Sequence, residues 1–146
     1  MKALLIEDNK TVSEMVRVML EGDGFAVDTV ALGEHGVATA RTEDHDVIVL
    51  DLMLPDIDGF EVLRRLRAAH VGTPVLVLSG LQETENKIKS LQSGADDYMT
   101  KPFNRNEFLA RMRALTRRGK SLARPNFESG RPAVTLDTST FLMMYR

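Results

Sequence analysis

Five polar residues that could take part in phosphoryl transfer follow short apolar runs of the chain. They are Glu7, Asp8, Asp51, Ser79 and Lys101. Carboxylate oxygens without histidine or cysteine suit Mg²⁺, which takes one or two carboxylates, several waters and a phosphate. An ammonium and a hydroxyl can bind phosphate oxygens, and a carboxylate can accept a phosphoryl group covalently. If these residues meet in space, the sequence predicts a Mg²⁺-dependent phosphoacceptor site with Asp51 as the acceptor.

The elements around these residues place them at one edge of a sheet. Asp51 follows a β-branched apolar run and precedes a loop that contains Pro55 and Gly59, after which helical spacing begins near Asp58. Strand patterns cover residues 3–6, 25–30, 46–50, 74–78 and 95–99, and helical patterns cover 11–22, 33–41, 58–67, 84–93 and 104–118. This alternation predicts an α/β fold, with a parallel sheet wrapped by helices through right-handed crossovers. The fold we expect is a doubly wound, flavodoxin-like (βα)5 three-layer sandwich. If its parallel sheet has the order 2-1-3-4-5, the first and third strands flank the ligand-binding crevice.

Simpler interpretations compete with a site. A single acid at a strand end is more often a turn residue or a helix cap, and we interpret Asp56 and Asp58 in that way. Five such residues at strand ends are harder to explain by capping alone, which favours a site. A metal-dependent phosphatase fits less well, because Met53 and not a second acid stands two residues after Asp51. The histidines lack metal-ligand spacing, so we predict surface positions for His35, His45 and His70.

The composition of the chain limits the classes of protein to which it can belong. The chain has 146 residues, 43% of them hydrophobic, which suits one domain with a core and a short extra segment. It has no cysteine, and therefore neither disulfides nor thiolate metal sites. We find no apolar stretch of membrane-spanning length and no signal peptide, so we expect a soluble, cytoplasmic protein without a membrane partner. The net charge of −2 divides into −6 for residues 1–116 and +4 for residues 117–146, a weak indication of a polyanionic partner.

Four motifs stand at these strand ends. They are Leu5-Ile6-Glu7-Asp8-Asn9, Val49-Leu50-Asp51-Leu52-Met53-Leu54-Pro55-Asp56 with Gly59, Leu78-Ser79-Gly80 and Lys101-Pro102-Phe103. Together they resemble the receiver domain of two-component response regulators, over residues 1 to about 118. Ser79 stands where many members have threonine and Asn9 where many have aspartate, and neither change removes a needed group.

The resemblance implies a role for each site residue. Asp51 would accept phosphate from a histidine kinase or a histidine phosphotransfer protein, so the domain would be a phosphoacceptor rather than an enzyme with a separate substrate. Asp8, Asp51 and the Met53 carbonyl would bind Mg²⁺, with Glu7 holding metal-bound waters. Ser79 and Tyr98 would form a switch pair, and Lys101 would bind the phosphate. We also expect a cis bond between Lys101 and Pro102.

A narrower resemblance concerns dimerisation. Lys87-Ile88-Lys89-Ser90-Leu91 and residues 94–103 and 107–118 resemble the winged-helix (OmpR/PhoB) class, and residues 32–34, 73–74 and 78–80 resemble a cell-cycle regulator of that class. The resemblance implies a homodimer, formed on phosphorylation through the fourth helix, fifth strand and fifth helix. By position, Lys87 would pair with Glu107, Asp97 with Arg111, and Asp96 with Arg118. Ile88, Leu91 and Ala110 would form the apolar patch between these pairs.

Residues 119–146 form a second segment in this interpretation. The prolines, serines and glycine of residues 121–132 are typical of a linker, and residues 133–143 resemble the first hairpin of a winged-helix output domain. Fewer than 30 residues follow Arg118, whereas such a domain needs roughly 100. We therefore expect a tail or a remnant of an output domain, without a recognition helix, that contacts DNA only indirectly. The apolar residues at 141–145 should pack on the receiver or on another chain.

Two functions remain open at this stage. The first is a signalling receiver without DNA binding of its own, acting by dimerisation or by competition for phosphate. The second is a transcription regulator that contacts DNA through the basic tail or through a partner. In both, Met53 and Leu81 border the approach to the phosphoryl group and cannot orient a water molecule. We therefore predict slow hydrolysis of the aspartyl phosphate.

Overall fold

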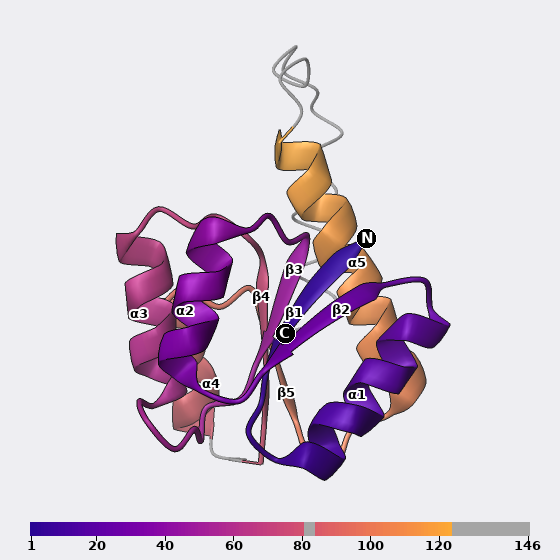
Figure 1. Cartoon of the computed structure of the whole chain (residues 1–146), viewed down its shortest axis with the longest axis horizontal. Helices are drawn as coiled ribbons and strands as arrows, with labels where there is room; N and C mark the ends of the chain where they lie inside the picture. The colour runs from indigo at the N-terminus through magenta and orange to yellow at the C-terminus, as the bar shows by residue number, and fades with distance from the viewer. Residues whose placement is uncertain (81–83, 124–146) are drawn as a thin grey trace.

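Figure 1 shows one sheet between two layers of helices. The structure is a computed structural model that describes residues 1–80 and 84–123, of which residues 118–123 are described by their backbone alone. Strands and helices alternate along the chain as β1 (Lys2–Ile6), α1 (Lys10–Gly22), β2 (Ala26–Val30), α2 (Gly33–Thr42), β3 (Val47–Leu50), α3 (Gly59–Ala68), β4 (Val75–Ser79), α4 (Thr84–Gln92), β5 (Asp97–Thr100) and α5 (Arg105–Ala123).

The strands are parallel and lie in the order β2-β1-β3-β4-β5, which confirms the predicted fold and topology. Ile6 at the end of β1 pairs with Val30 on one side and Leu50 on the other, and Leu50 pairs with Val77. The strand ends therefore meet at one edge of the sheet. Helices α1 and α5 cover one face, and α2, α3 and α4 cover the other (Figure 1). The direction of winding changes between β1 and β3, which is where doubly wound folds bind their ligands.

Alternating side chains give each face of the sheet its own apolar core. Leu4 and Ile6 of β1 pack on the face covered by α2 and α3, whereas Ala3 and Leu5 pack on the face covered by α1 and α5. All residues of β3 are buried. A strand buried on both faces has no polar side to show, which is why a continuous apolar run marks it in the sequence.

The residues directly before α1, α3 and α5 cap these helices with their side chains, and at α5 Asn104 Oδ1 accepts the Glu107 N–H at 2.9 Å. Asn9 Oδ1 accepts a hydrogen bond from the Val12 N–H at 3.0 Å and begins α1. Asp58 Oδ1 accepts one from the Glu61 N–H at 2.9 Å and begins α3, so the predicted cap at Asp58 is confirmed.

Strand β5 begins two residues later than its sequence pattern predicted. Gly94 turns the chain with φ of 117°, and the Ala95 N–H still donates to the Ser90 carbonyl at 2.9 Å. Residue 95 therefore closes the preceding helix, and contact with β4 begins at the Asp96 N–H, which donates to the Val75 carbonyl at 2.8 Å. Asp97 is the first residue of the strand.

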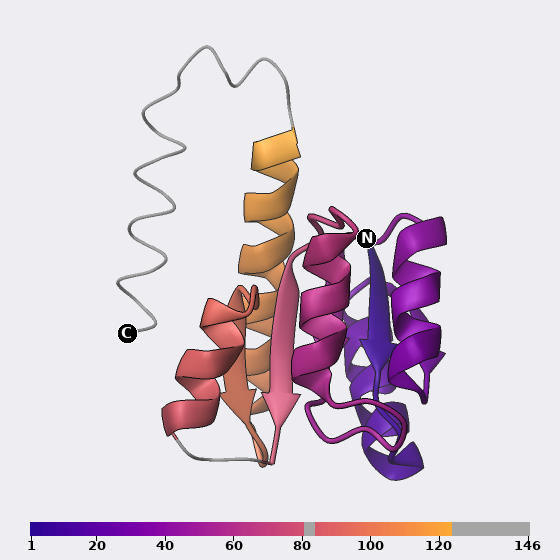
Figure 2. The ribbon, with the colours of Figure 1, turned by 90° about the vertical axis from the view of Figure 1, so that its left-hand side faces the viewer.

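Helix α5 is longer than predicted. It runs to Ala123, includes the first three residues of the expected linker, and extends past the end of the sheet (Figure 2). Leu122 and Ala123 are good helix formers, and the first proline after the helix is Pro125. The rest of the expected linker and the expected hairpin lie outside the described residues. Within the part of the chain that the structure describes, none of the helices has the length and apolar character needed to cross a membrane.

Candidate functional site

Three carboxylates meet where β1 and β3 end. Glu7, Asp8 and Asp51 each offer an oxygen atom, and these oxygens lie within 4.8 Å of one another. Glu7 and Asp51 are buried, 5% and 6% exposed, while Asp8 is exposed. The structure thus brings together the acids that the sequence placed at two separate strand ends.

Backbone hydrogen bonds continue past the strands and position these acids. The Asp51 N–H donates to the Ile6 carbonyl at 3.0 Å, and the Glu7 N–H donates to the Val30 carbonyl at 3.0 Å. The first residue after each strand is therefore still held in the register of the sheet. The Met53 N–H donates to Asp51 Oδ1 at 3.3 Å and orients the carboxylate from the loop side.

Lys101 provides the cation of the site. Its Nζ lies 2.8 Å from Glu7 Oε1 and 3.7 Å from Asp51 Oδ2. The bond from Lys101 to Pro102 is cis, as predicted. The Lys101 N–H donates to the Ser79 carbonyl at 2.8 Å, so this residue is fixed at the end of β4 while its side chain reaches across to β1 and β3.

The predicted switch pair is in contact. The side chains of Ser79 and Tyr98 are hydrogen-bonded, and both residues are buried, at 0% and 5% exposed. Burial raises the pKa of Tyr98 above its usual value of 10.0, with the Ser79 hydrogen bond opposing this effect. The phenol therefore stays protonated at neutral pH.

The negatively charged form of Asp51 is energetically unfavourable in this environment. Burial, followed by the charge of Glu7, raises its pKa from 3.8 to about 6, against the opposing effects of Lys101 and the Met53 N–H. Crowded carboxylates of this kind favour a cation that joins them. Two buried carboxylates and one exposed carboxylate, all oxygen donors, fit a hard divalent cation such as Mg²⁺. The observed donor set is thus compatible with the predicted metal.

Comparison with known proteins agrees with this geometry. Residues 3–113 match the sequence profile of the response regulator receiver domain. The receiver domain of the Francisella response regulator 1452 shares the fold with a TM-score of 0.77 and 38% identity, over 80% of this chain and 97% of that one. The chain belongs to the response regulator receiver family.

Other receivers and regulators resemble this receiver. The receiver domain of sensor histidine kinase PA1611 from Pseudomonas aeruginosa PAO1, described with a magnesium ion coordinated in its active site cleft, has a TM-score of 0.70 and 33% identity, over 80% of this chain and 94% of that one. The cell cycle transcriptional regulator CtrA of Caulobacter vibrioides and the cell cycle response regulator CtrA of Brucella abortus are each 46% identical over 140 residues, or 96% of this chain. These matches confirm the narrower resemblance to a cell-cycle regulator. The chain spans 61% and 60% of the length of these two relatives.

The loop after Asp51 packs tightly where it enters α3 of the receiver. The Gly59 N–H donates to the Leu52 carbonyl at 2.8 Å. A Cβ atom on Gly59 would lie 2.6 Å from Leu52 Cα and 2.8 Å from the Asp51 carbonyl oxygen. Any side chain at this position would therefore push the end of β3 away from the start of α3.

The residues predicted to form a dimer face lie on α4, β5 and α5, except Asp96, which lies directly before β5. Ile88 and Leu91 of α4 are 49% and 41% exposed, and Lys87, Glu107 and Ala110 lie at least partly in solvent as well. Exposed apolar side chains next to charged ones are what such an interface requires. The pairing of Lys87 with Glu107 across two chains stays a prediction.

All three acids predicted for this face have partners within the same chain. Arg111 Nη1 lies 2.9 Å from Asp97 Oδ1, and Arg111 Nη2 lies 2.6 Å from Glu107 Oε2. Asp96 Oδ2 lies 3.2 Å from Arg67 Nη2 and accepts the Val75 N–H at 2.8 Å. A partner chain would have to share or replace these contacts. The side chain of Arg118, the predicted partner of Asp96, lies outside the described residues.

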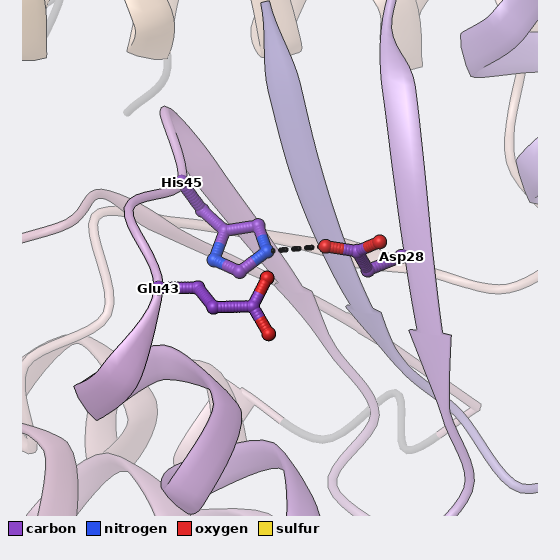
Figure 3. Close-up of side chains that lie close together, drawn as sticks. All are labelled: Asp28, Glu43 and His45. Atoms are coloured by element: carbon purple, nitrogen blue, oxygen red, sulfur yellow. Dashed lines mark hydrogen bonds and ion pairs between the residues drawn. The ribbon is translucent and has the colours of Figure 1, made fainter.

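The prediction of a surface position for His45 is wrong. Its side chain is 1% exposed, and its Nε2 lies 2.9 Å from Asp28 Oδ2 (Figure 3). Together with Glu43 these residues form a second group of potential metal ligands within 4.8 Å of one another. However, Lys2 Nζ lies 3.5 Å from Asp28 and 3.2 Å from Glu43. The ammonium already offsets both carboxylates, so we interpret the group as a structural ion-pair network. The other two histidines are exposed, as predicted.

Proposed function

We propose that this receiver accepts a phosphoryl group on Asp51 from a phosphohistidine of a histidine kinase or a histidine phosphotransfer protein. The observation that carries the proposal is the position of Asp51, buried at the end of β3 with Glu7 and Asp8 within 4.8 Å and Lys101 Nζ at 3.7 Å. An oxygen of Asp51 attacks phosphorus, a P–O bond forms, and the P–N bond breaks with its electron pair leaving on the imidazole nitrogen. Met53 N–H and Lys101 orient the attacking carboxylate.

Asp8, Asp51 and the Met53 carbonyl are the proposed ligands of Mg²⁺, with Glu7 holding metal-bound water. The cation supplies positive charge that offsets the carboxylates and the transferring phosphoryl group. Glu7 already uses Oε1 to bind Lys101 and Oε2 to accept the Asn9 N–H at 3.1 Å. It is therefore suited to contact the metal through water rather than directly.

Phosphorylation is proposed to act through the hydroxyl and ammonium groups on the β4 and β5 side. Lys101 binds a phosphoryl oxygen, and Ser79 contacts another while remaining linked to Tyr98. This link joins the phosphorylation site to β5, which belongs to the predicted dimer face. We propose that phosphorylated receivers form a homodimer through α4, β5 and α5.

A phosphorylation assay tests the acceptor directly. The protein is incubated with Mg²⁺ and a labelled phosphohistidine donor, and the bound label is tested for the lability of an acyl phosphate. Asp51→Asn keeps the shape of the side chain and should accept no label, while Asp46→Asn, which changes an exposed acid before β3, should accept it. Label retained by Asp51→Asn contradicts the assignment of the acceptor.

The relatives favour a role in transcription regulation. The CtrA proteins of Caulobacter vibrioides and Brucella abortus are named as a cell cycle transcriptional regulator and a cell cycle response regulator, and the match extends over 140 residues, beyond the receiver itself. We propose that this chain serves a regulator of that kind, with residues 1–118 as the receiver and residues 119–146 as the connection toward an output function. A gel-shift series at several salt concentrations, with and without phosphorylation, tests for DNA binding by this chain. Binding by the basic tail alone should weaken steeply as salt rises.

A further inference from the structure

Helix α2 is capped by a residue that lies 23 positions after its first residue. Its own N-cap residue, Leu32, has no side-chain hydrogen bond to the helix. Instead, Asp56 of the loop between β3 and α3 reaches across. Asp56 Oδ1 accepts the Gly33 N–H at 2.8 Å, and Asp56 Oδ2 accepts the Glu34 N–H at 2.9 Å. Both oxygens of one carboxylate thus join the loop to the helix.

Apolar packing reinforces this junction. A Cβ atom on Gly33 would lie 2.7 Å from Ile57 Cγ1 and 2.8 Å from Val62 Cγ2. The first turn of α2 is therefore in close contact with the residue after Asp56 and with α3. Ile57 itself packs against the core on this face of the sheet. The middle of the loop is held by α2 through a polar and an apolar contact side by side.

The same loop carries the proposed metal ligand Met53. Its ends are fixed, since Asp51 continues the register of β3 and the Gly59 N–H donates to the Leu52 carbonyl. The Met53 side chain is 62% exposed and gives its backbone little packing. Its N–H makes one long hydrogen bond of 3.3 Å to Asp51. The position of the Met53 carbonyl must therefore depend on contacts further along the loop.

We propose that Asp56 is a positioning residue for the metal site. In this proposal, its contacts with the start of α2 hold the loop between β3 and α3, which carries Met53, in place. The inference rests on the proposed function, because it assumes that the Met53 carbonyl binds Mg²⁺. A side chain that supports a metal ligand from outside the coordination shell acts on metal affinity, whereas a simple helix cap acts on stability alone. Asp58, which caps α3 at the end of the same loop, provides the matched comparison.

The test compares Asp56→Asn with Asp58→Asn. Both variants lose a negative charge from the same loop, but an asparagine in place of Asp56 has one acceptor oxygen and could no longer accept both N–H groups. We measure Mg²⁺ affinity by calorimetry, thermal stability by circular dichroism, and the shift of the Met53 amide resonance on addition of Mg²⁺. We expect Mg²⁺ to bind about tenfold more weakly to Asp56→Asn, in the range found for residues that support metal ligands. Asp58→Asn should keep the affinity of the wild type.

Two controls keep the outcome clear. Asp56→Ser, which retains one acceptor on a shorter side chain, should be folded and should also bind Mg²⁺ more weakly than the wild type. Asp8→Asn should lose affinity through a direct ligand. If Asp56→Asn and Asp56→Ser bind Mg²⁺ as tightly as the wild type while Asp8→Asn does not, the positioning role is wrong and the metal site stands. If the wild type itself binds no Mg²⁺, the proposed function is wrong, and the positioning role of Asp56 is wrong with it.

Discussion

Replacing Asp51 with Asn should stabilise the metal-free receiver at neutral pH. The wild-type carboxylate is buried beside Glu7, and these effects raise its pKa from 3.8 to about 6. Since a tenfold change in an ionisation equilibrium is worth about 1.4 kcal/mol, a charged Asp51 costs the folded state about 3 kcal/mol. Asparagine removes the charge and retains an oxygen for the Met53 N–H. We expect the free energy of unfolding to increase by about 2–3 kcal/mol.

The pH dependence follows from the direction of the shift. Because the pKa is higher in the folded state than in the unfolded state, the folded wild type holds its proton where the unfolded chain has lost it. The cost is therefore absent below pH 3.8, grows between pH 3.8 and about 6, and is complete above that range. The advantage of Asp51→Asn should be largest above the folded-state pKa and should nearly vanish close to the unfolded-state value.

Urea unfolding measures the difference in the free energy of unfolding between the wild type and Asp51→Asn. We would measure it at one pH below this range, one within it and one above it. Each measurement is made first with EDTA and then with excess Mg²⁺. Magnesium should stabilise the wild type much more than Asp51→Asn, because the cation offsets the same charge that the substitution removes. Asp46→Asn removes an exposed carboxylate and serves as the control. Equal stability of Asp51→Asn and wild type at neutral pH without Mg²⁺ would refute the role given to the buried charge.

Three further predictions test other parts of the structure. Gly59→Ala should destabilise the fold by about 1–3 kcal/mol through overpacking, since the methyl group would lie 2.6 Å from Leu52 Cα; an unchanged urea midpoint contradicts that close approach. Lys87→Glu should weaken the phosphorylated dimer in sedimentation without affecting phosphorylation, and adding Glu107→Lys should restore it. A dimer indifferent to both changes excludes this face. Met53→Glu should shorten the lifetime of the aspartyl phosphate, because a carboxylate at this exposed position can orient water; an equal lifetime rules out that role.

Lys87 is a better probe of the dimer face than Arg111. The two residues are equivalent partners in the sequence pattern, but Arg111 is bound to buried Asp97 within the same chain. Reversing the charge of Arg111 would leave a buried carboxylate beside a like charge, and a folding defect would then resemble a loss of dimer. Lys87 lies on the solvent side of α4 and is not fully buried, so its substitution leaves the core intact.

The sequence by itself was sufficient to predict the fold class and the polar residues that stand at the strand ends. Strands buried on both faces appear as continuous apolar runs, so Val47–Leu50 could be identified without a structure. Parallel strands end at one edge, which is sufficient to predict that Glu7, Asp51 and Lys101 meet. These features depend on the local pattern of residue types and on the direction of the chain, and both can be read from the sequence.

Only the tertiary structure decided which neighbours those residues have. Asp56 caps α2 and not its own helix, and His45 is buried against Asp28, because segments distant in sequence meet only when the sheet forms. The raised pKa of Asp51 likewise needs the actual depth of burial and the actual position of Glu7. Hydrogen bonds and charge interactions depend on distances of a few ångströms, and a sequence pattern constrains residue type and spacing but not those distances.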